Sequence, residues 1–318
     1  MSVSSQSQTD ERLEFILKEF MREIRSERRK SFILRILMWI YLIGSTIAFV
    51  VFVTQGKESR VTDESPHVAK IDIIGTIDRK TGVAAYPTIA ALEKAFETET
   101  AEAIVLDMDS PGGSAAQSDL VYRELRRLRA EHPEKPVFAV IGDVCASGCY
   151  YIASAADEII VNRTSMIGSI GVRMDGFDFT ELMQKVGVER RILSAGKNKI
   201  LSDPFVEMEP EVKSHLETNI LAETHQVFIE AVKEGRGDRL VADENLFTGL
   251  VWLGEKAIEK GLADRVGSVQ TVLRELGADV EPINYTNRPV RLMDWITGRA
   301  VEVLSNVKYE LDRPRLEM

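Results

Sequence analysis

An uncharged apolar run near the start of the chain places the strongest constraint on its fold. Residues 36–54, ILMWIYLIGSTIAFVVFVT, contain no charged side chain over 19 positions. As an α-helix with a rise of 1.5 Å per residue, this run measures about 28 Å, close to the ~30 Å hydrocarbon core of a bilayer. A buried core helix would normally keep a polar face, and a cleaved signal peptide would have a shorter apolar core before an A-x-A-like site. We therefore predict one transmembrane helix over residues 36–54.

Basic residues around this span predict its orientation. They crowd the segment before the span and are sparse just after it: Lys18, Arg22, Arg25, Arg28, Arg29, Lys30 and Arg35 precede it, and Lys57, Arg60 and Lys70 follow it. Because basic loops stay in the cytoplasm, we expect a single-pass protein of the inner (cytoplasmic) membrane, with residues 1–35 as a cytoplasmic N-terminal arm. A polar linker at residues 55–66 then leads to a periplasmic or otherwise extracytoplasmic domain.

The rest of the chain alternates between strand-like and helix-like segments. Short β-branched runs predict strands at residues 67–78, 101–109, 135–142, 157–162 and 168–174. Amphipathic or capped segments predict helices at residues 87–99, 114–132 and 209–237. This alternation indicates an α/β domain, which we place at residues 67–280. Residues 281–318 are expected to form a C-terminal helical extension, with its helix at residues 292–307.

Composition excludes several classes of partner. The formal net charge is −10, and no stripe of lysine and arginine interleaves with aromatic residues, so we expect no nucleic-acid partner. No CxxC, HExxH or Cys/His cluster has the spacing of a metal site, and we predict no metal and no cofactor. The chain has two cysteines, Cys145 and Cys149. An oxidising compartment would permit a disulfide between them, but it would compete with the geometry of the turn, so we expect two buried free thiols.

A serine in a glycine-containing turn is the candidate nucleophile. Ser147 lies in DVCASGCYYIASAAD, residues 143–157, between an expected strand and a helical run. A second turn of this kind, DSPGGS, follows another expected strand. Strand ends in a layered α/β domain share one edge, so the backbone N–H groups of Gly112, Gly113 and Gly148 could bracket the serine hydroxyl as an oxyanion hole. The alternative is that both turns are tight connecting loops.

The proton acceptor for such a serine is less evident. None of the histidines falls in a glycine-rich turn beside a strand end, and each is expected to be a surface or packing residue: His67, His132, His215 and His225. A neutral lysine can replace histidine when burial lowers its pKa, and serine–lysine pairs are a known variant of the catalytic triad. Lys197 and Lys199 occur in ILSAGKNKILSDPF, among apolar residues. Taken alone, either lysine could equally be a solvated loop residue.

Four separated motifs resemble one family when taken together. In order, they are DSPGGS, ASGCYYIASAADEIIVNRTSMIGSIGV, AGKNKILSDPF and VWLGEKAIEKGLADRVG. Their order and spacing are similar to those of signal peptide peptidase A, a family of membrane-anchored serine–lysine proteases with the ClpP/crotonase-like fold of repeated ββα units. The resemblance covers about residues 66–278. It implies the short form of the family, with one transmembrane helix and one protease domain.

The resemblance assigns roles to individual residues. It implies Ser147 as nucleophile, Lys199 as general base, Gly113 or Gly112 together with Gly148 as oxyanion donors, and Ser169 as a residue that helps to orient the lysine. The chain departs from the family pattern at Asn198, where an aromatic residue is usual, at Cys149, where glycine or alanine is usual, and at Leu253, where threonine is usual. Because Asn198 alters the apolar surroundings of the lysine, Lys197 stays open as the base. Cys149 stays open as an alternative nucleophile.

The resemblance also implies an assembly and a substrate class. A chain with one protease domain would take its serine and lysine from neighbouring subunits of a ring-like homo-oligomer. We expect a serine endopeptidase that cleaves remnant signal peptides and other extended peptides outside the cytoplasm. The alternatives are a broader quality-control protease for membrane proteins, a non-catalytic peptide-binding scaffold, and an acyl-CoA hydratase or isomerase. The last is disfavoured because CoA esters are cytoplasmic.

Overall fold

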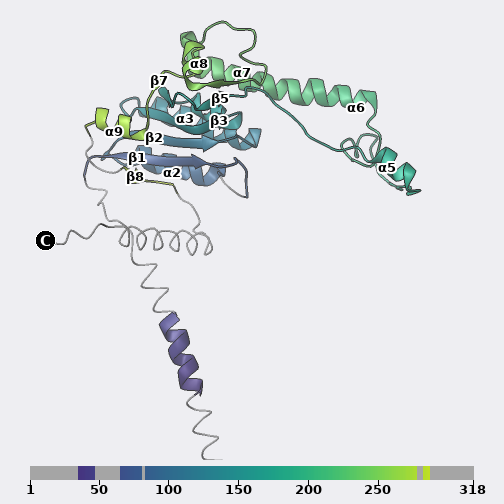
Figure 1. Ribbon diagram of the computed structural model, residues 1–318, viewed down its shortest axis with the longest axis horizontal. Coiled ribbons are helices and arrows are strands. Elements are labelled where there is room, and N and C mark those ends of the chain that lie inside the picture. The colour runs from purple at the N-terminus through teal and green to yellow at the C-terminus, as the bar shows by residue number, and fades with distance from the viewer. Residues whose placement is uncertain (1–34, 47–64, 81–82, 278–281, 287–318) are drawn as a thin grey trace, which may run out of the picture. The chain divides into compact units, whose positions relative to one another are not determined.

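The computed structural model describes residues 35–46, 65–80, 83–277 and 282–286 (Figure 1). Its contacts divide the chain into two units, Met1–Thr62 and Asp63–Met318. In the first unit, residues 35–46 are helical and their side chains are exposed. No helix among the described residues is both long enough and apolar enough to cross a membrane. Residues 47–54 of the expected span lie outside the described ranges, so the transmembrane helix stays a prediction.

The second unit is built on one mixed sheet, which confirms the predicted α/β class. The described strands are β1 (His67–Ile74), β2 (Ala101–Ser110), β3 (Val137–Ala146), β4 (Glu158–Val161), β5 (Met166–Gly168), β6 (Val251–Leu253), β7 (Arg265–Val266) and β8 (Ile283–Asn284). They lie in the order β6-β5-β3-β2-β1-β8, and β4 pairs with β3 and β7. Among the described pairs, β5 with β6 is antiparallel and the others are parallel.

The central strands bury side chains on both faces. Residues of a strand alternate between the two faces of its sheet, and the chain uses both alternations. Ile71, Leu106 and Ala139 belong to a large apolar cluster on one face. Val105 and Val140 belong to a smaller cluster on the other. This two-sided burial explains why these strands are near-continuous apolar runs, as is typical of parallel sheets.

Helices pack on both faces of the sheet, several on one face and α9 (Val269–Glu275) on the other. The large cluster takes residues from α2 (Ala85–Glu97), α3 (Ala115–Glu131), α4 (Gly148–Ala153) and α7 (Glu223–Arg236). The small cluster takes Val272 from α9. The remaining helical elements are α5 (Thr180–Lys185), α6 (Pro210–His215), the π-helix η1 (Leu216–Ala222), the 3-10 helix η2 (Gly237–Arg239) and α8 (Gly254–Glu259). The long helix expected at residues 209–237 is thus α6, η1 and α7 in succession.

Three expected boundaries differ from the structure. The strand expected at residues 168–174 is wrong, because β5 ends at Gly168 and the next residue, Ser169, has a φ of 51°, which a strand does not allow. The helix expected to begin at Pro87 begins at Ala85, and its first turn accommodates the proline. The sheet also includes β8, from the segment assigned to the C-terminal extension. The helix expected at residues 292–307 lies outside the described residues.

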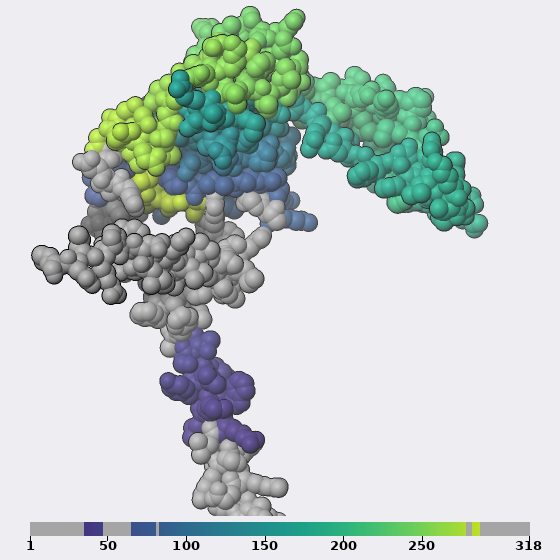
Figure 2. Space-filling model, in the orientation of Figure 1, coloured from purple at the N-terminus to yellow at the C-terminus, as the bar shows by residue number. Residues whose placement is uncertain are grey.

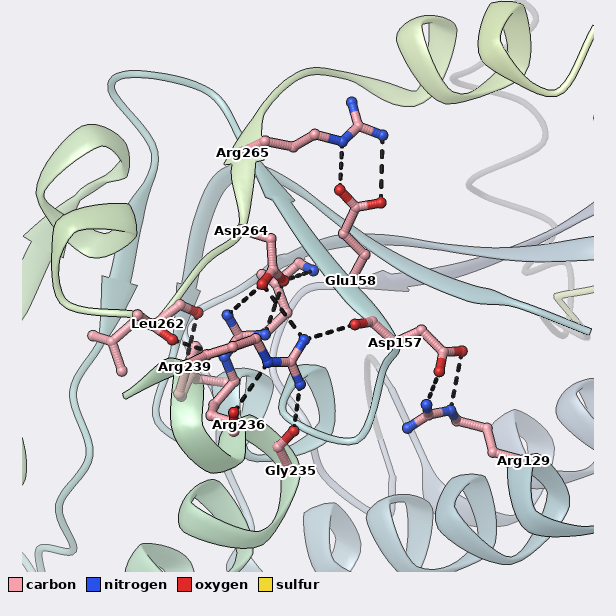
Figure 3. Close-up of polar contacts among 12 residues, drawn as sticks. Arg129, Asp157, Glu158, Gly235, Arg236, Arg239, Leu262, Asp264 and Arg265 are labelled. Carbon is pink, nitrogen blue, oxygen red and sulfur yellow. Dashed lines mark hydrogen bonds and ion pairs between the residues drawn. The ribbon is translucent and has the colours of Figure 1, made fainter. Parts of the chain in front are cut away.

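A buried arginine ties the end of α7 to the sheet (Figure 3). Arg236 is 1% exposed; its Nε donates to the carbonyl oxygen of Gly261, and its two terminal nitrogens donate to the two carboxylate oxygens of Asp264, all at 2.8 Å. Asp264 also accepts the backbone N–H of Ile159 in β4 at 2.7 Å. Burial by itself would raise the pKa of Asp264, but the bonds from Arg236 and Ile159 outweigh it and hold that pKa below its usual value.

Candidate active site

The two glycine-containing turns lie at one edge of the sheet. β2 and β3 are parallel neighbours, and Ser110 at the end of β2 pairs with Cys145 near the end of β3. The chain leaves β2 through residues 111–114 and enters α3, and it leaves β3 through Ser147 and enters α4. Ser114 caps α3 by accepting the backbone N–H of Gln117 at 3.4 Å. The helices α3 and α4 therefore both begin beside the candidate nucleophile.

Ser147 has a backbone conformation that is rare for a residue with a side chain. Its φ is 53° and its ψ is −122°, outside the regions that L-residues normally occupy. Two hydrogen bonds hold it there: its N–H donates to the carbonyl oxygen of Gly168 at 2.8 Å, and its carbonyl oxygen accepts the N–H of Tyr151 at 2.9 Å. The side chain makes no capping bond to α4. Such conformations cost roughly 1–3 kcal/mol and tend to cluster at functional sites.

The three predicted oxyanion glycines lie close to one another beside this serine. A Cβ added to Gly112 would lie 2.9 Å from Cβ of Ser147 and 2.7 Å from the backbone nitrogen of Gly148. A Cβ added to Gly148 would lie 3.3 Å from the backbone nitrogen of Gly113. Gly148 is the first residue of α4, where an N–H lacks an intrahelical acceptor. Within the described part of the chain, the N–H of Gly113 makes no backbone hydrogen bond. Two backbone donors are therefore adjacent beside Ser147.

Ser147 opens into a cleft of about 1290 Å³. Gly112, Gly113, Gly148 and Ser169 also line it, so five of the six predicted site residues meet at this cleft. Ser169 shares the positive φ of Ser147, and its N–H donates to the carbonyl oxygen of Leu250 at 2.8 Å. The walls are of mixed polarity, and they include Tyr151, Val172, Ile220, Glu223, Val227 and Phe228.

Two polar features of the cleft were not predicted from the sequence. Tyr151 donates its hydroxyl to the carboxylate of Asp119 at 2.9 Å, and both residues line the cleft. Burial, followed by this hydrogen bond, raises the pKa of Tyr151 above its usual value, so the hydroxyl stays protonated. Ser118 is fully buried, donates to the carbonyl oxygen of Ser114 at 3.0 Å and lies against Gly148. The signal for Tyr151 and Ser118 was their spacing of one helical turn, four residues after Ser147 and Ser114 respectively.

The sixth predicted residue, Lys199, does not line this cleft. It is exposed, and it lies in a turn in which its N–H donates to the carbonyl oxygen of Gly196 at 3.2 Å. Lys197 is also exposed, and its amine pairs with Glu211 at 2.9 Å. That hydrogen bond raises the pKa of Lys197, which opposes the neutral form that a base requires. Among the residues that line the cleft there is no lysine and no histidine.

The two cysteines form a disulfide, so the prediction of free thiols was wrong. Cys145 lies in β3 and Cys149 lies in α4, and their Cα atoms are 5.1 Å apart. This separation is within the range that a disulfide spans. The turn through Ser147 brings the strand and the helix close enough for the bond, instead of competing with it. A cysteine in a disulfide cannot act as a nucleophile, which removes Cys149 from that role in this state.

Comparisons with known proteins place the chain among peptidases. The profile of peptidase family S49 matches residues 129–281. The putative protease MJ0651 of Methanocaldococcus jannaschii is 28% identical over 261 residues, which cover 78% of this chain and 82% of that protein. The chloroplastic serine protease SPPA of Arabidopsis thaliana is 31% identical over 222 residues, which cover 67% of this chain and 32% of that protein.

A third relative shows that such a domain also occurs within larger proteins. The Na(+)/H(+) antiporter NhaA of Brucella melitensis biotype 1 is 45% identical over 194 residues, which cover 60% of this chain. The match spans only about a quarter of the antiporter, 26% of its length. The similarity therefore concerns one part of that protein.

Proposed function

The chain belongs to peptidase family S49, and on that premise we propose that it is a membrane-anchored serine endopeptidase that cleaves remnant signal peptides and other extended peptides outside the cytoplasm. The observation that carries the proposal is the turn at Ser147. A serine hydroxyl opens into a cleft from a strand–helix junction, next to the backbone N–H groups of Gly113 and Gly148. This is the arrangement that acyl transfer requires of a nucleophile and its oxyanion hole.

The proposed reaction follows from these groups. Oγ of Ser147 attacks the carbonyl carbon of a peptide bond and gives up its proton to a base. The N–H groups of Gly113 and Gly148 then donate hydrogen bonds to the oxyanion of the tetrahedral intermediate. Losing one such donor typically costs about 10²–10³-fold in rate. The amine product leaves with a proton, and water releases the acyl group from Ser147 in the second half of the reaction.

We assign the base to Lys199 of a neighbouring subunit. The cleft of one chain supplies no lysine or histidine among its lining residues, although a serine nucleophile needs a proton acceptor. Lys199 is carried by residues 173–209, within the teal-to-green arm that extends away from the sheet in Figure 2. In the single chain this segment exposes many apolar side chains: Met174, Phe177, Leu182, Val186, Val188, Leu193, Phe205 and Met208. An exposed apolar surface of this kind is typical of a protein–protein interface. A second copy that covers it could receive Lys199 at its own Ser147.

The disulfide supports the proposed extracytoplasmic location. Disulfides persist in oxidising compartments and are rare in the cytoplasm. The Cys145–Cys149 bond lies within the candidate site, so the site itself fits a compartment on the outer side of the membrane. The predicted transmembrane helix and the basic residues before it give the same placement.

A membrane-impermeant, serine-directed acylating probe on intact cells tests the nucleophile and the compartment together. We expect the full chain to be labelled at Ser147 and the Ser147→Ala variant to lose both labelling and peptide cleavage, the latter by about 10⁴-fold or more. Lys185→Ala, which removes an exposed lysine of α5, is the matched control and should keep both. An unlabelled wild-type chain that still binds extended peptide would instead support the non-catalytic scaffold.

Mixing two inactive variants tests the shared site. The Ser147→Ala chain can contribute only a lysine, and the Lys199→Ala chain only a serine. If each site takes one residue from each of two subunits, random co-assembly at a 1:1 ratio restores about a quarter of the sites. Each variant alone provides the baseline. No recovery in the mixture would place the base in the same chain as Ser147.

A further inference from the structure

A disulfide encloses the candidate nucleophile. Cys145 and Cys149 are each two residues from Ser147, so their bond closes a ring of five residues with the serine at its middle. Both cysteines are fully buried. Cys145 is fixed on two sides, by its pairing with Ser110 of β2 and with Ile167 of β5. The bond thus joins the last residues of a central strand to the first turn of α4, across the residue with the rare backbone conformation.

We propose that the Cys145–Cys149 disulfide positions Ser147 for catalysis, so that the enzyme is active with the bond formed and much less active with it reduced. This inference rests on the proposed function, because it assigns the disulfide a role in the reaction of Ser147. The two cysteines touch neither the peptide nor the reacting atoms, and they act through the backbone of the turn. They are positioning residues.

Sulfur contact distances give the direction of the effect. A covalent bond holds two sulfurs closer together than free thiols can approach, by about 1.5 Å. After reduction the two sulfur atoms must move apart by this distance within a packed core, and a packed core relaxes only partially. Cys145 is held by strand pairing on both sides, so separating the sulfurs moves the part of the ring toward Cys149. That part is closely packed, since a Cβ on Gly148 would already lie 2.4 Å from Oγ of Ser118, and a shift there therefore disturbs its neighbours.

A displaced turn would misalign the nucleophile and its oxyanion donors together. Ser147 and Gly148 lie within the ring, whereas Gly113 lies outside it, on the turn after β2. A movement of the ring changes the distance from the N–H of Gly113 to the oxyanion position. A misplacement of about 1 Å can cost about 10²-fold in rate. The cleft walls on α3 and α7 are outside the ring, so we expect peptide binding to change much less than turnover.

The redox step is an ordinary thiol–disulfide exchange. A dithiol reductant attacks the disulfide through its thiolate, passes through a mixed disulfide and is itself oxidised to a disulfide. The protein gains two electrons and two protons as the Cys145 and Cys149 thiols, and the reductant loses them. A disulfide oxidant reverses the exchange. Because both sulfurs are buried, the exchange requires local opening of the turn and will be slow in the folded protein.

The test compares three forms of the full chain in detergent: the oxidised wild type, the wild type reduced with dithiothreitol, and the Cys145→Ala/Cys149→Ala variant. Thiol alkylation and mass spectrometry count the reduced sites. We expect reduction to lower kcat at least 10-fold with less than a threefold change in KM, and reoxidation to restore it. The double alanine variant has neither a bond to reduce nor thiols to separate, so dithiothreitol should leave its kcat unchanged; it is the control for effects of the reductant elsewhere.

A second variant and a second measurement keep the inference falsifiable. Cys149→Ser alone cannot form the bond, and we expect it to have a low kcat without any reductant. It tests the inference even where the buried disulfide of the wild type resists reduction. Hydrogen exchange of residues 143–153 should rise on reduction relative to β1 and β2, whether or not the protein cleaves peptides. The inference would be overturned if the oxidised protein and the fully reduced protein, as counted by alkylation, had equal kcat. Unchanged hydrogen exchange of residues 143–153 on reduction would also overturn it. An oxidised wild type that neither cleaves nor reacts with the probe would instead overturn the proposed function.

Discussion

The nucleophile region and the lysine region of this chain are built in opposite ways. Ser147 lies between β3 and α4, where its glycine neighbours touch backbone atoms of other turns. Lys199 lies in an exposed turn between α5 and α6 (Figure 1). Neither of these two helices contains a buried residue. One chain therefore fixes the geometry of the nucleophile by its own packing. Under the proposed function, the geometry of the base is fixed only when a second chain packs against residues 173–209.

Two glycines with nearly the same backbone conformation give the sharpest test of this contrast. Gly112 has a φ of 92° and Gly196 a φ of 98°, but a Cβ on Gly112 would lie 2.6 Å from the carbonyl oxygen of Ala146, whereas a Cβ on Gly196 would meet nothing within 4 Å. Both alanine variants incur the strain of a positive φ, about 1–2 kcal/mol. Only Gly112→Ala adds a backbone clash, which brings its total cost to about 2–5 kcal/mol.

We therefore expect Gly112→Ala to lower the free energy of unfolding and to abolish cleavage, and Gly196→Ala to do neither to a comparable degree. Urea denaturation followed by circular dichroism gives the first quantity, and peptide hydrolysis the second. Equal losses of stability in the two variants would mean that packing in the single chain does not distinguish the regions.

Two carboxylates with lowered pKa values extend the comparison to charge. Asp264 is paired with the buried Arg236, and Glu211 with the exposed Lys197. The hydrogen bond from Lys197 lowers the pKa of Glu211, much as the bonds from Arg236 hold that of Asp264 below its usual value. Asp264→Asn leaves a buried guanidinium without its counter-charge and should cost about 3 kcal/mol at neutral pH. Glu211→Gln breaks a solvated pair and should cause no measurable change.

The sign of the pH dependence follows from the lowered pKa of Asp264. Its carboxylate stabilises the fold above the pKa of the unfolded chain, about 3.9, and this contribution is lost as pH falls through the lower folded value. The difference in unfolding free energy between wild type and Asp264→Asn should therefore be constant near pH 7 and shrink below about pH 4. Denaturation series at several pH values measure it. A difference that grows toward acid pH would contradict the assignment.

The sequence predicted the packed region better than the exposed one. β1, β2 and β3 were found because each is a near-continuous apolar run, and the turns after β2 and β3 because glycine and proline mark them. β5 was misplaced because the alternation after Gly168 resembles a strand, while the positive φ of Ser169 has no sequence signal. The π-helical segment Leu216–Ala222 likewise looks like ordinary helix in the sequence. Local patterns identify elements but not the backbone irregularities between them.

The remaining differences depend on long-range geometry. The disulfide was missed because the sequence gives the separation of Cys145 and Cys149 along the chain and not the 5.1 Å between their Cα atoms. The cleft residue Asp119 was missed because its partner, Tyr151, lies on another helix. Lys199 was selected through family resemblance. Motif spacing alone could not place it relative to the cleft. The resemblance, which implies a serine and a lysine from neighbouring subunits, is compatible with its absence from the cleft lining of its own chain.

A small effect on the single subunit is also expected for an aromatic residue of the lysine region. The Phe205 ring stacks on Phe179 at 5.4 Å between centroids and lies beneath the guanidinium of Arg190 at 5.1 Å, but it is 37% exposed. Phe205→Ala should therefore cost a single subunit only about 1 kcal/mol. Phe228→Ala, which empties a site in the core, should cost about 3–5 kcal/mol. If a second chain covers residues 173–209, sedimentation velocity of the full chain in detergent will show Phe205→Ala shifted to smaller species at a given concentration. An unchanged distribution, together with normal activity, would mean that this segment does not hold subunits together and that the base must come from elsewhere.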